Sequence, residues 1–165
     1  MEDYEKEFQD KSVMIIGGLG FIGSNLTHKL TELKTKRIII VDSLVEGGGG
    51  NLKNVEEIKD KIEVYICDMG DREKMGKLIQ NVDYIFNLAG SISHSGSKEN
   101  PLRDLELNLI AHVNFLENCR EYKKENPNSN LKILFTGTRD QYGKVKEEFL
   151  PVNEMQLVHH AADPQ

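Results

Sequence analysis

The stretch "SVMIIGGLGFIGSNL" (residues 12–26) joins a run of apolar residues to the start of a helical pattern through a glycine-rich turn. Gly17, Gly20 and Gly23 follow the spacing G-x-x-G-x-x-G. At a strand-to-helix turn the first glycine permits the tight bend, the second lets the backbone approach a pyrophosphate, and the third lets helix and strand pack closely. The stretch therefore predicts a dinucleotide site in which phosphates meet the amides that begin a helix.

A carboxylate follows where such a site needs one. The apolar run "RIIIVD" (37–42) ends at Asp42, nineteen positions after Gly23. An acidic side chain there accepts hydrogen bonds from the adenosine ribose and repels a 2′-phosphate. We therefore expect NAD rather than NADP as the cofactor. The alternative is that the glycines serve only packing and that Asp42 is an ordinary residue at a strand end.

The chain alternates apolar runs with amphipathic segments, which is typical of βαβ units and a parallel sheet. The expected strands are residues 13–17, 37–42, 62–68, 83–90 and 131–137. Their nearly continuous apolar composition indicates strands that are covered on both faces. Residues 21–33 and 71–79 read as crossover helices, and the longest helix begins near Pro101. That helix carries an apolar stripe formed by Leu102, Leu105, Leu109, Val113 and Leu116.

Composition and charge point to a small-molecule partner. The chain has 165 residues, a net charge of -6 and mixed charges, so it offers no basic face for nucleic acid or a membrane surface. No apolar run approaches the roughly 20 residues of a membrane span, and the acidic N-terminus does not resemble a secretion signal. We expect one domain in a cytoplasmic protein. Cys67 and Cys119 are expected to be buried thiols.

Other conspicuous residues have ordinary interpretations. The stretch "VEGGGGNLKN" (45–54) is interpreted as a flexible connection rather than a phosphate cradle, because no strand-to-helix turn surrounds its glycines. His28 and His112 are expected on helix surfaces, and His94 in a serine-rich loop. We expect no metal site.

Several motifs together resemble a known family. "GGLGFIGSNL", "VDSL", "CDMGD", "NLAG", "NLIAHVNFLENCR" and "FTGTRDQYG" occur in the order seen in extended short-chain dehydrogenase/reductases, specifically the nucleotide-sugar epimerases and dehydratases. The resemblance covers residues 12 to about 154. It implies an α/β, Rossmann-like fold with a doubly wound parallel sheet of strand order 3-2-1-4-5. In this chain we expect the fold to be truncated after the fifth strand. Residues 1–11 are then an N-terminal extension, 12–143 the NAD-binding domain, and 144–165 a polar tail leading toward an absent catalytic helix and substrate domain.

The resemblance also implies a path for NAD. Phe21 and Ile22 would lie over the pyrophosphate. The ribose and adenine would be lined by Asp42, Ser43, Leu44, Asp68 and Met69, and the fourth strand would contribute Leu88, Ala89 and Gly90. Asn108 matches the asparagine of the family's N-x-x-G-T pattern, but Ala111 and His112 stand where Gly and Thr are usual.

For the chemistry, the resemblance implies a reversible hydride transfer between a nucleotide sugar and NAD. Thr138 matches the Ser or Thr whose hydroxyl binds the reacting sugar oxygen. Arg139 and Asp140 replace the Asp-Glu pair usual in dehydratases, which favours an enzyme like UDP-glucose 4-epimerase. Tyr142 and Lys146 have the spacing of the family's Tyr-x-x-x-Lys pair but come too early in the chain, so we interpret them as a coincidence.

We therefore expect the cofactor-binding portion of an epimerase, inactive on its own. A 4,6-dehydratase or a reductase of the same family is an alternative parent enzyme, and a non-catalytic NAD-binding or interaction protein is an alternative of another class. The apolar stripe on the helix from Pro101, or the edge of the fifth strand, predicts self-association. Each leucine or valine of this stripe that stays exposed to water would lose about 1.5–3 kcal/mol of hydrophobic stabilisation.

Overall fold

The computed structural model describes residues 6–91, 93–138, 145, 147, 150 and 151. The chain divides into two units, Met1–Phe135 and Thr136–Gln165, and each is described by itself. The first unit holds the sheet and the helices that cover it. The expected domain boundaries at residues 11 and 143 remain predictions.

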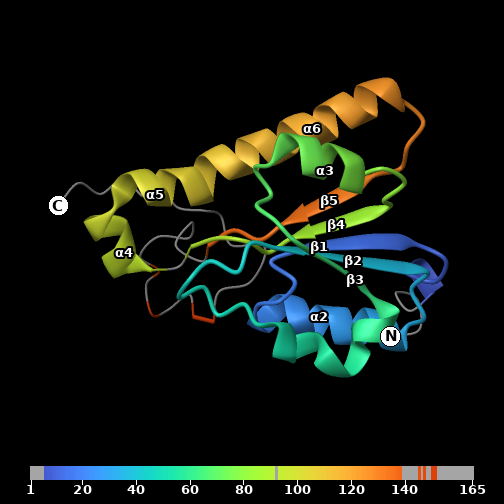
Figure 1. Ribbon diagram of the computed structural model, residues 1–165, viewed down its shortest axis with the longest axis horizontal. Helices are drawn as coiled ribbons and strands as arrows, with labels where there is room; N and C mark the ends of the chain where they lie inside the picture. The colour runs from blue at the N-terminus through green and yellow to red at the C-terminus, as the bar shows by residue number, and fades with distance from the viewer. Residues whose placement is uncertain (1–5, 92, 139–144, 146, 148–149, 152–165) are drawn as a thin grey trace. The chain divides into compact units, whose positions relative to one another are not determined.

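A parallel five-stranded sheet forms the centre of the first unit (Figure 1). Its strands are β1 Ser12–Ile16, β2 Arg37–Asp42, β3 Glu63–Ile66, β4 Tyr84–Asn87 and β5 Lys132–Phe135. Their order is β3-β2-β1-β4-β5, which confirms the predicted fold and strand order. The register places Ile16 beside both Val41 and Asn87, so the carboxyl ends of β1, β2 and β4 lie together at one edge of the sheet.

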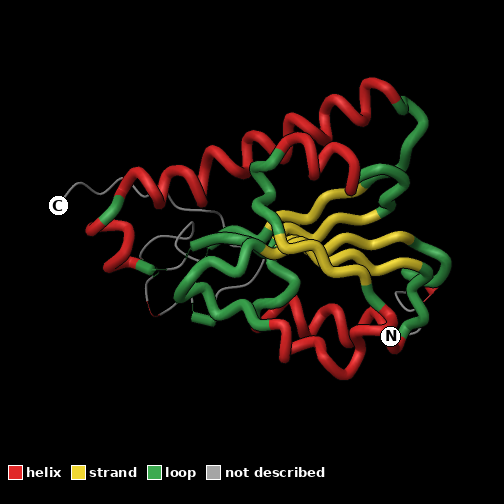
Figure 2. The backbone as a smooth tube through the Cα atoms, in the orientation of Figure 1, coloured by secondary structure: helices red, strands yellow, loops and turns green. Residues whose placement is uncertain are grey.

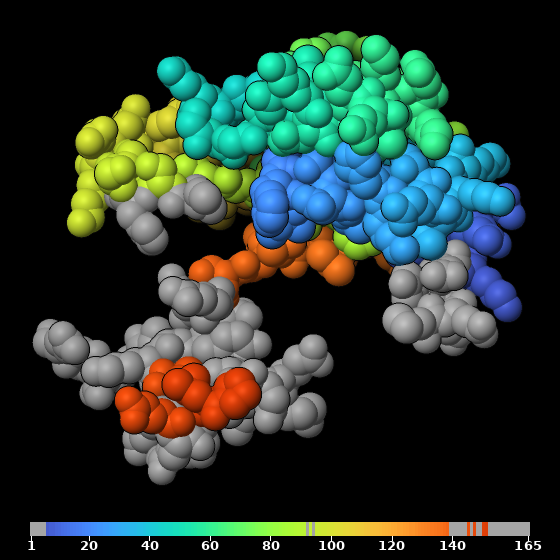
Figure 3. All heavy atoms as spheres, turned by 90° about the horizontal axis from the view of Figure 1, so that it is seen from below, coloured from blue at the N-terminus to red at the C-terminus, as the bar shows by residue number. Residues whose placement is uncertain are grey.

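Helices cover both faces of the sheet (Figure 2). One face carries α2 Phe21–Glu32 and the 3₁₀ helix η1 Leu52–Lys61, which lie side by side (Figure 3). The other face carries α3 Arg72–Leu78 and a long helix built from α5 Pro101–Leu105, the π-helical turn η2 Glu106–Ile110, and α6 Ala111–Glu125. The short α4 His94–Glu99 precedes α5. As predicted, the long helix begins at Pro101, where Asn100 accepts a hydrogen bond from the Arg103 amide at 3.0 Å.

The core lies between the sheet and the helices. All five residues of β1 and the central four of β2 are buried, as their apolar sequences predict. On α6, Phe115 is fully buried against the sheet. The expectation of cover on both faces is wrong for the two edge strands, β3 and β5. In β3, Tyr65 and Ile66 are 38% and 50% exposed, and in β5 the apolar residues Ile133, Leu134 and Phe135 are 39–61% exposed.

The segment before β1 packs on the sheet. The Phe8 ring lies edge-on to Tyr84 with ring centroids 5.2 Å apart, and 6.1 Å from the ring of Phe86. Glu7 contacts the Tyr84 hydroxyl. Part of the predicted N-terminal extension therefore covers a face of β4. Within the described residues, no helix is long and apolar enough to cross a bilayer.

Candidate functional site

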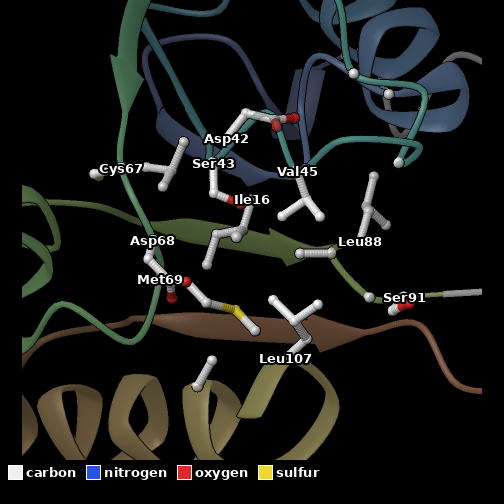
Figure 4. Close-up of a pocket in the computed structure, with 18 of the residues that line it drawn as sticks. Ile16, Asp42, Ser43, Val45, Cys67, Asp68, Met69, Leu88, Ser91 and Leu107 are labelled. Carbon is white, nitrogen blue, oxygen red and sulfur yellow. The ribbon is translucent and has the colours of Figure 1, made fainter. Parts of the chain in front are cut away.

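A pocket of about 250 Å³ lies at the carboxyl edge of the sheet (Figure 4). Its walls come from the ends of β1 to β4, and Figure 4 shows Ile16 between Asp42 on one side and Met69 with Leu107 on the other. The strand order reverses direction between β1 and β4, and ligands of doubly wound sheets bind at this switch point. The fold therefore places a ligand cleft where the sequence predicts the cofactor.

The glycine turn between β1 and α2 forms one wall of the pocket. Gly17 has φ = +78°, a conformation that favours glycine, and a Cβ there would lie 3.0 Å from the Ala89 nitrogen. Gly20 is the N-cap of α2, and no side chain caps the helix or adds an acidic group to its first turn. The first amides of α2 thus remain available to an anion. A Cβ on Gly23 would lie 2.3 Å from the Gly17 carbonyl oxygen, so only glycine permits this close packing of helix and turn.

Asp42, at the end of β2, fixes this turn. One carboxylate oxygen accepts a hydrogen bond from the Leu19 amide at 3.0 Å, and the other accepts one from the Leu44 amide at 2.9 Å. The Leu19 carbonyl accepts hydrogen bonds from the Asn51 amide and from the Asn54 side chain, at 3.1 and 2.8 Å. The carboxylate is thereby held in a defined position at the pocket, where its remaining lone pairs can accept from a ligand.

The end of β3 contributes Cys67, Asp68 and Met69 to the pocket. An oxygen of Asp68 accepts a hydrogen bond from the Gly70 amide at 2.7 Å, which fixes the turn after the strand. Burial raises the pKa of the Cys67 thiol, so it lines the pocket as a neutral group. Burial also raises the pKa of Cys119, to about 12. The prediction that both thiols are buried is confirmed.

The end of β4 forms the wall next to α5 and α6. Leu88, Ala89 and Gly90 line the pocket together with Ser91. Asn108, in the π-helical turn, holds Ser91 from both sides. Its side-chain oxygen accepts from the Ser91 amide at 2.7 Å, and its nitrogen donates to the Ser91 carbonyl at 3.2 Å. π-Helical turns often mark functional positions, and this one holds the strand exit.

The structure brings most of the predicted cofactor residues together. The predicted residues that line the pocket are Gly17, Gly20, Asp42, Ser43, Asp68, Met69, Leu88, Ala89 and Gly90. The Phe21 and Ile22 side chains are exposed. Leu44 packs against the buried cluster that contains Leu19 and Ile40, and Asn108 contacts the pocket residue Ser91. Thr138 belongs to the second unit, so its catalytic role stays a prediction. Tyr142 and Lys146 lie outside the described residues.

The sequence patterns did not predict two features of the site, the position of the glycine-rich loop and the burial of His112. The loop interpreted as a mere connection, residues 45–50, lines the pocket with Val45, Glu46 and three of its glycines, and η1 already begins at Leu52. The expectation that His112 lies on the helix surface is wrong, because this side of α6 packs against the ends of β4 and β5 and leaves the residue 9% exposed. No group of His, Cys, Asp or Glu suited to a metal is found among the described residues.

Comparison with known proteins agrees with this geometry. Residues 14–162 match the family described as GDP-mannose 4,6 dehydratase. The chain belongs to this family. Among its curated relatives, the CDP-paratose 2-epimerase of Salmonella typhi is 29% identical over 137 residues, which are 82% of this chain and 39% of the relative.

Solved structures of related enzymes share the fold. The Bordetella bronchiseptica enzyme WbmF, in complex with NAD+, is 25% identical with a TM-score of 0.70 over 90% of this chain and 41% of its own. The UDP-glucose 4-epimerase of Thermotoga maritima, with UDP-glucose, is 29% identical with a TM-score of 0.68 over 82% and 41% of the two chains. The chain spans about two fifths of the length of the curated relatives that it matches.

Proposed function

We propose that this chain binds NAD in the pocket at the ends of β1, β2 and β4 and forms the cofactor-binding portion of a nucleotide-sugar epimerase. The observation that carries the proposal is the hydrogen bond between the Asp42 carboxylate and the Leu19 amide of the glycine turn. It joins the two recognition elements of a dinucleotide, a turn for the pyrophosphate and a carboxylate for the ribose, into one rigid unit.

The residues of the pocket fit a dinucleotide. A side chain at Gly17 would run into the backbone at Ala89, so at this point of the pocket the turn has to approach the end of β4 without a side chain between them. The first turn of α2 carries no carboxylate that would repel a pyrophosphate. On the adenine side, Met69 supplies an apolar surface, and the free lone pairs of Asp68 can accept from an exocyclic amine.

The proposed reaction belongs to the whole parent enzyme. NAD bound in this pocket would supply a reversible acceptor for the hydride of a sugar carbon. The residues of this chain would hold the dinucleotide and exclude water from it, and the Thr138 hydroxyl would bind the reacting sugar oxygen. An epimerase is favoured over a dehydratase because Arg139 and Asp140 follow Thr138 in place of an Asp-Glu pair. The family's solved structures include one with UDP-glucose, which supports a nucleotide sugar of this type as the substrate.

Calorimetric titration with NAD and NADP tests the proposal. NAD is expected to bind, and NADP to bind at least tenfold more weakly, because its 2′-phosphate meets the Asp42 carboxylate.

Asp42→Asn removes that charge and one hydrogen-bond acceptor. It should weaken NAD binding about tenfold, since a hydrogen bond to a charged group contributes about 1.5–3 kcal/mol, and it should reduce the difference in affinity between NAD and NADP. Asp60→Asn, at an exposed position of η1, is the matched control and should change neither affinity. Heat with NADP but none with NAD would refute the role of Asp42.

We also propose that copies of the chain associate through the outer face of the long helix. Leu105, Leu109, Val113 and Leu116 lie on this face and are 44–53% exposed. Spacings of four, four and three residues align them along the helix, so a second copy can cover them together. The observation that supports a second copy as the partner is that this apolar face is about half exposed to solvent.

Sedimentation velocity tests the association. The protein is expected to sediment as an oligomer at micromolar concentration. Leu109→Lys combined with Leu116→Lys should raise the dissociation constant by at least 100-fold, because each buried leucine contributes about 1.5–3 kcal/mol. Leu52→Lys is the control, since Leu52 is 51% exposed but lies on η1, which covers the opposite face of the sheet. A wild-type protein that sediments only as a monomer would contradict the association.

A further inference from the structure

His112 touches the ends of two neighbouring strands from its place on α6. Its Nδ1 lies 3.1 Å from the side-chain nitrogen of Asn87, the last residue of β4. The imidazole also meets the ring of Phe135, the last residue of β5, edge to face, with centroids 5.3 Å apart and planes at 90°. His112 is 9% exposed and Asn87 is 2% exposed, so the Asn87 side-chain nitrogen and the His112 Nδ1 are buried and satisfy each other.

The direction of these hydrogen bonds follows from their chemistry. The Asn87 side-chain nitrogen can only donate, so Nδ1 of His112 accepts, and the neutral imidazole carries its hydrogen on Nε2. This orientation turns the Asn87 side-chain oxygen toward the Ala89 amide, which donates to it at 3.4 Å. A continuous path of hydrogen bonds therefore runs from the imidazole through Asn87 to the backbone of Ala89.

Ala89 lies at a critical place in the pocket. Its nitrogen stands 3.0 Å from the point that a Cβ on Gly17 would occupy, so a shift of Ala89 changes the gap across which a dinucleotide has to pass. Two residues farther on, Asn108 holds Ser91 by both of its backbone groups. Asn108 and His112 are four residues apart on one helix face and fix successive points of the same strand exit.

We propose that His112 is a positioning residue for the cofactor: it orients Asn87 so that the backbone at Ala89 keeps the cleft open to NAD. This inference rests on the NAD-binding function proposed above and assigns that site a further residue. If Nδ1 carried a proton, its N–H would face the side-chain N–H of Asn87. The Asn87 amide would then flip, and its nitrogen would replace the oxygen that accepts from the Ala89 amide. Burial lowers the pKa of His112 and favours the neutral imidazole that the arrangement needs.

Two substitutions separate this role from simple packing. His112→Asn places an amide oxygen at about the position of Nδ1 and preserves the acceptor for Asn87. His112→Leu has a similar branched shape but no acceptor, so it leaves the buried Asn87 donor unsatisfied. In calorimetric titrations of the full chain, His112→Leu should weaken NAD about tenfold, the range expected for one unsatisfied buried group, and His112→Asn should stay within about threefold of the wild type.

A nuclear magnetic resonance measurement on the wild type needs no variant. Long-range nitrogen–proton spectra of the imidazole distinguish its tautomers, and at neutral pH His112 is expected as the neutral form with the hydrogen on Nε2. The Ala89 amide resonance should move in His112→Leu and return toward its wild-type position in His112→Asn. A hydrogen on Nδ1 of the wild-type imidazole at neutral pH would overturn the inference even if His112→Leu fails to fold.

The outcomes also separate this inference from the function on which it rests. Wild-type binding of NAD that His112→Leu weakens and His112→Asn restores would support both. Binding that is equally strong in all three proteins would overturn the positioning role and leave the NAD site standing. A wild type that binds no NAD, with the Nε2 tautomer present, would overturn the proposed function and with it any role of His112 toward the cofactor.

Discussion

Gly23→Ala is expected to destabilise the protein by about 1–3 kcal/mol and to abolish measurable NAD binding, although alanine normally favours a helix over glycine. Gly23 lies in the first turn of α2, and a Cβ there would be 2.3 Å from the Gly17 carbonyl oxygen and 2.7 Å from the Gly18 Cα. These neighbours are backbone atoms, so no side chain can turn aside. The helix must move away from the glycine turn, and the amides proposed to bind the pyrophosphate move with it.

Gly76→Ala is the matched control for this prediction. Gly76 also lies within a helix, α3, but the nearest atom to its added Cβ is the Asn118 side-chain oxygen at 3.9 Å, an ordinary contact. There the helix preference of alanine acts alone, so Gly76→Ala should stabilise the protein by roughly 0.5–1 kcal/mol and leave NAD binding unchanged. Urea unfolding followed by circular dichroism measures the first quantity and calorimetry the second. Equal stabilisation by both substitutions would show that α2 does not depend on close approach to the turn.

The fold and the glycine turn were predictable because their signals are local. Gly17, Gly20 and Gly23 occur at fixed offsets between an apolar run and a helix, and this spacing has a direct steric meaning. Asp42 was predictable for the same reason, since the residue that ends β2 reaches the same edge of a parallel sheet as the end of β1. The sequence does not reveal that Asp42 holds the Leu19 amide, because residues 23 positions apart are brought together only by the tertiary structure.

The burial of His112 could not be read from periodicity. The long helix carries two apolar stripes, an outer one with Leu105, Leu109, Val113 and Leu116 and an inner one with Ala111, Phe115, Cys119 and Tyr122. Both have spacings of four, four and three, so the pattern cannot tell which stripe faces the sheet. His112 adjoins the inner stripe and meets the ends of β4 and β5. Its partner Asn87 is 25 positions away, beyond the reach of any helical or strand pattern.

The part of the glycine-rich loop in the pocket was missed for a different reason. The glycines at 47–50 can adopt many backbone conformations, and the amino-acid composition of the loop does not determine which of them it takes. The path is set by contacts outside the loop: the Asn51 amide donates to the Leu19 carbonyl, and a Cβ on Gly50 would lie 3.1 Å from an Asp42 oxygen. The loop therefore takes its position from the turn and the carboxylate that the sequence did predict.

Phe115→Ala is expected to lower the free energy of unfolding by about 3–5 kcal/mol, the range for removing a buried phenylalanine side chain. Phe115 is fully buried and belongs to the same core cluster as Met14, Val41 and Ile85. It therefore anchors α6 to the centre of the sheet. Because domains of this size have total stabilities of roughly 5–15 kcal/mol, the loss should shift the urea midpoint strongly and leave a measurable unfolded fraction in water if the wild type lies near the lower limit.

Leu116→Ala provides the control one residue along the helix. Leu116 is 52% exposed on the outer stripe, so its truncation should lower the stability by less than about 1 kcal/mol at a dilution where copies of the chain are dissociated. The contrast between adjacent positions measures which stripe of α6 faces the sheet. A larger loss at Leu116 than at Phe115 would mean that α6 packs with the opposite face inward, and the buried position of His112 beside Phe115 would then be wrong as well.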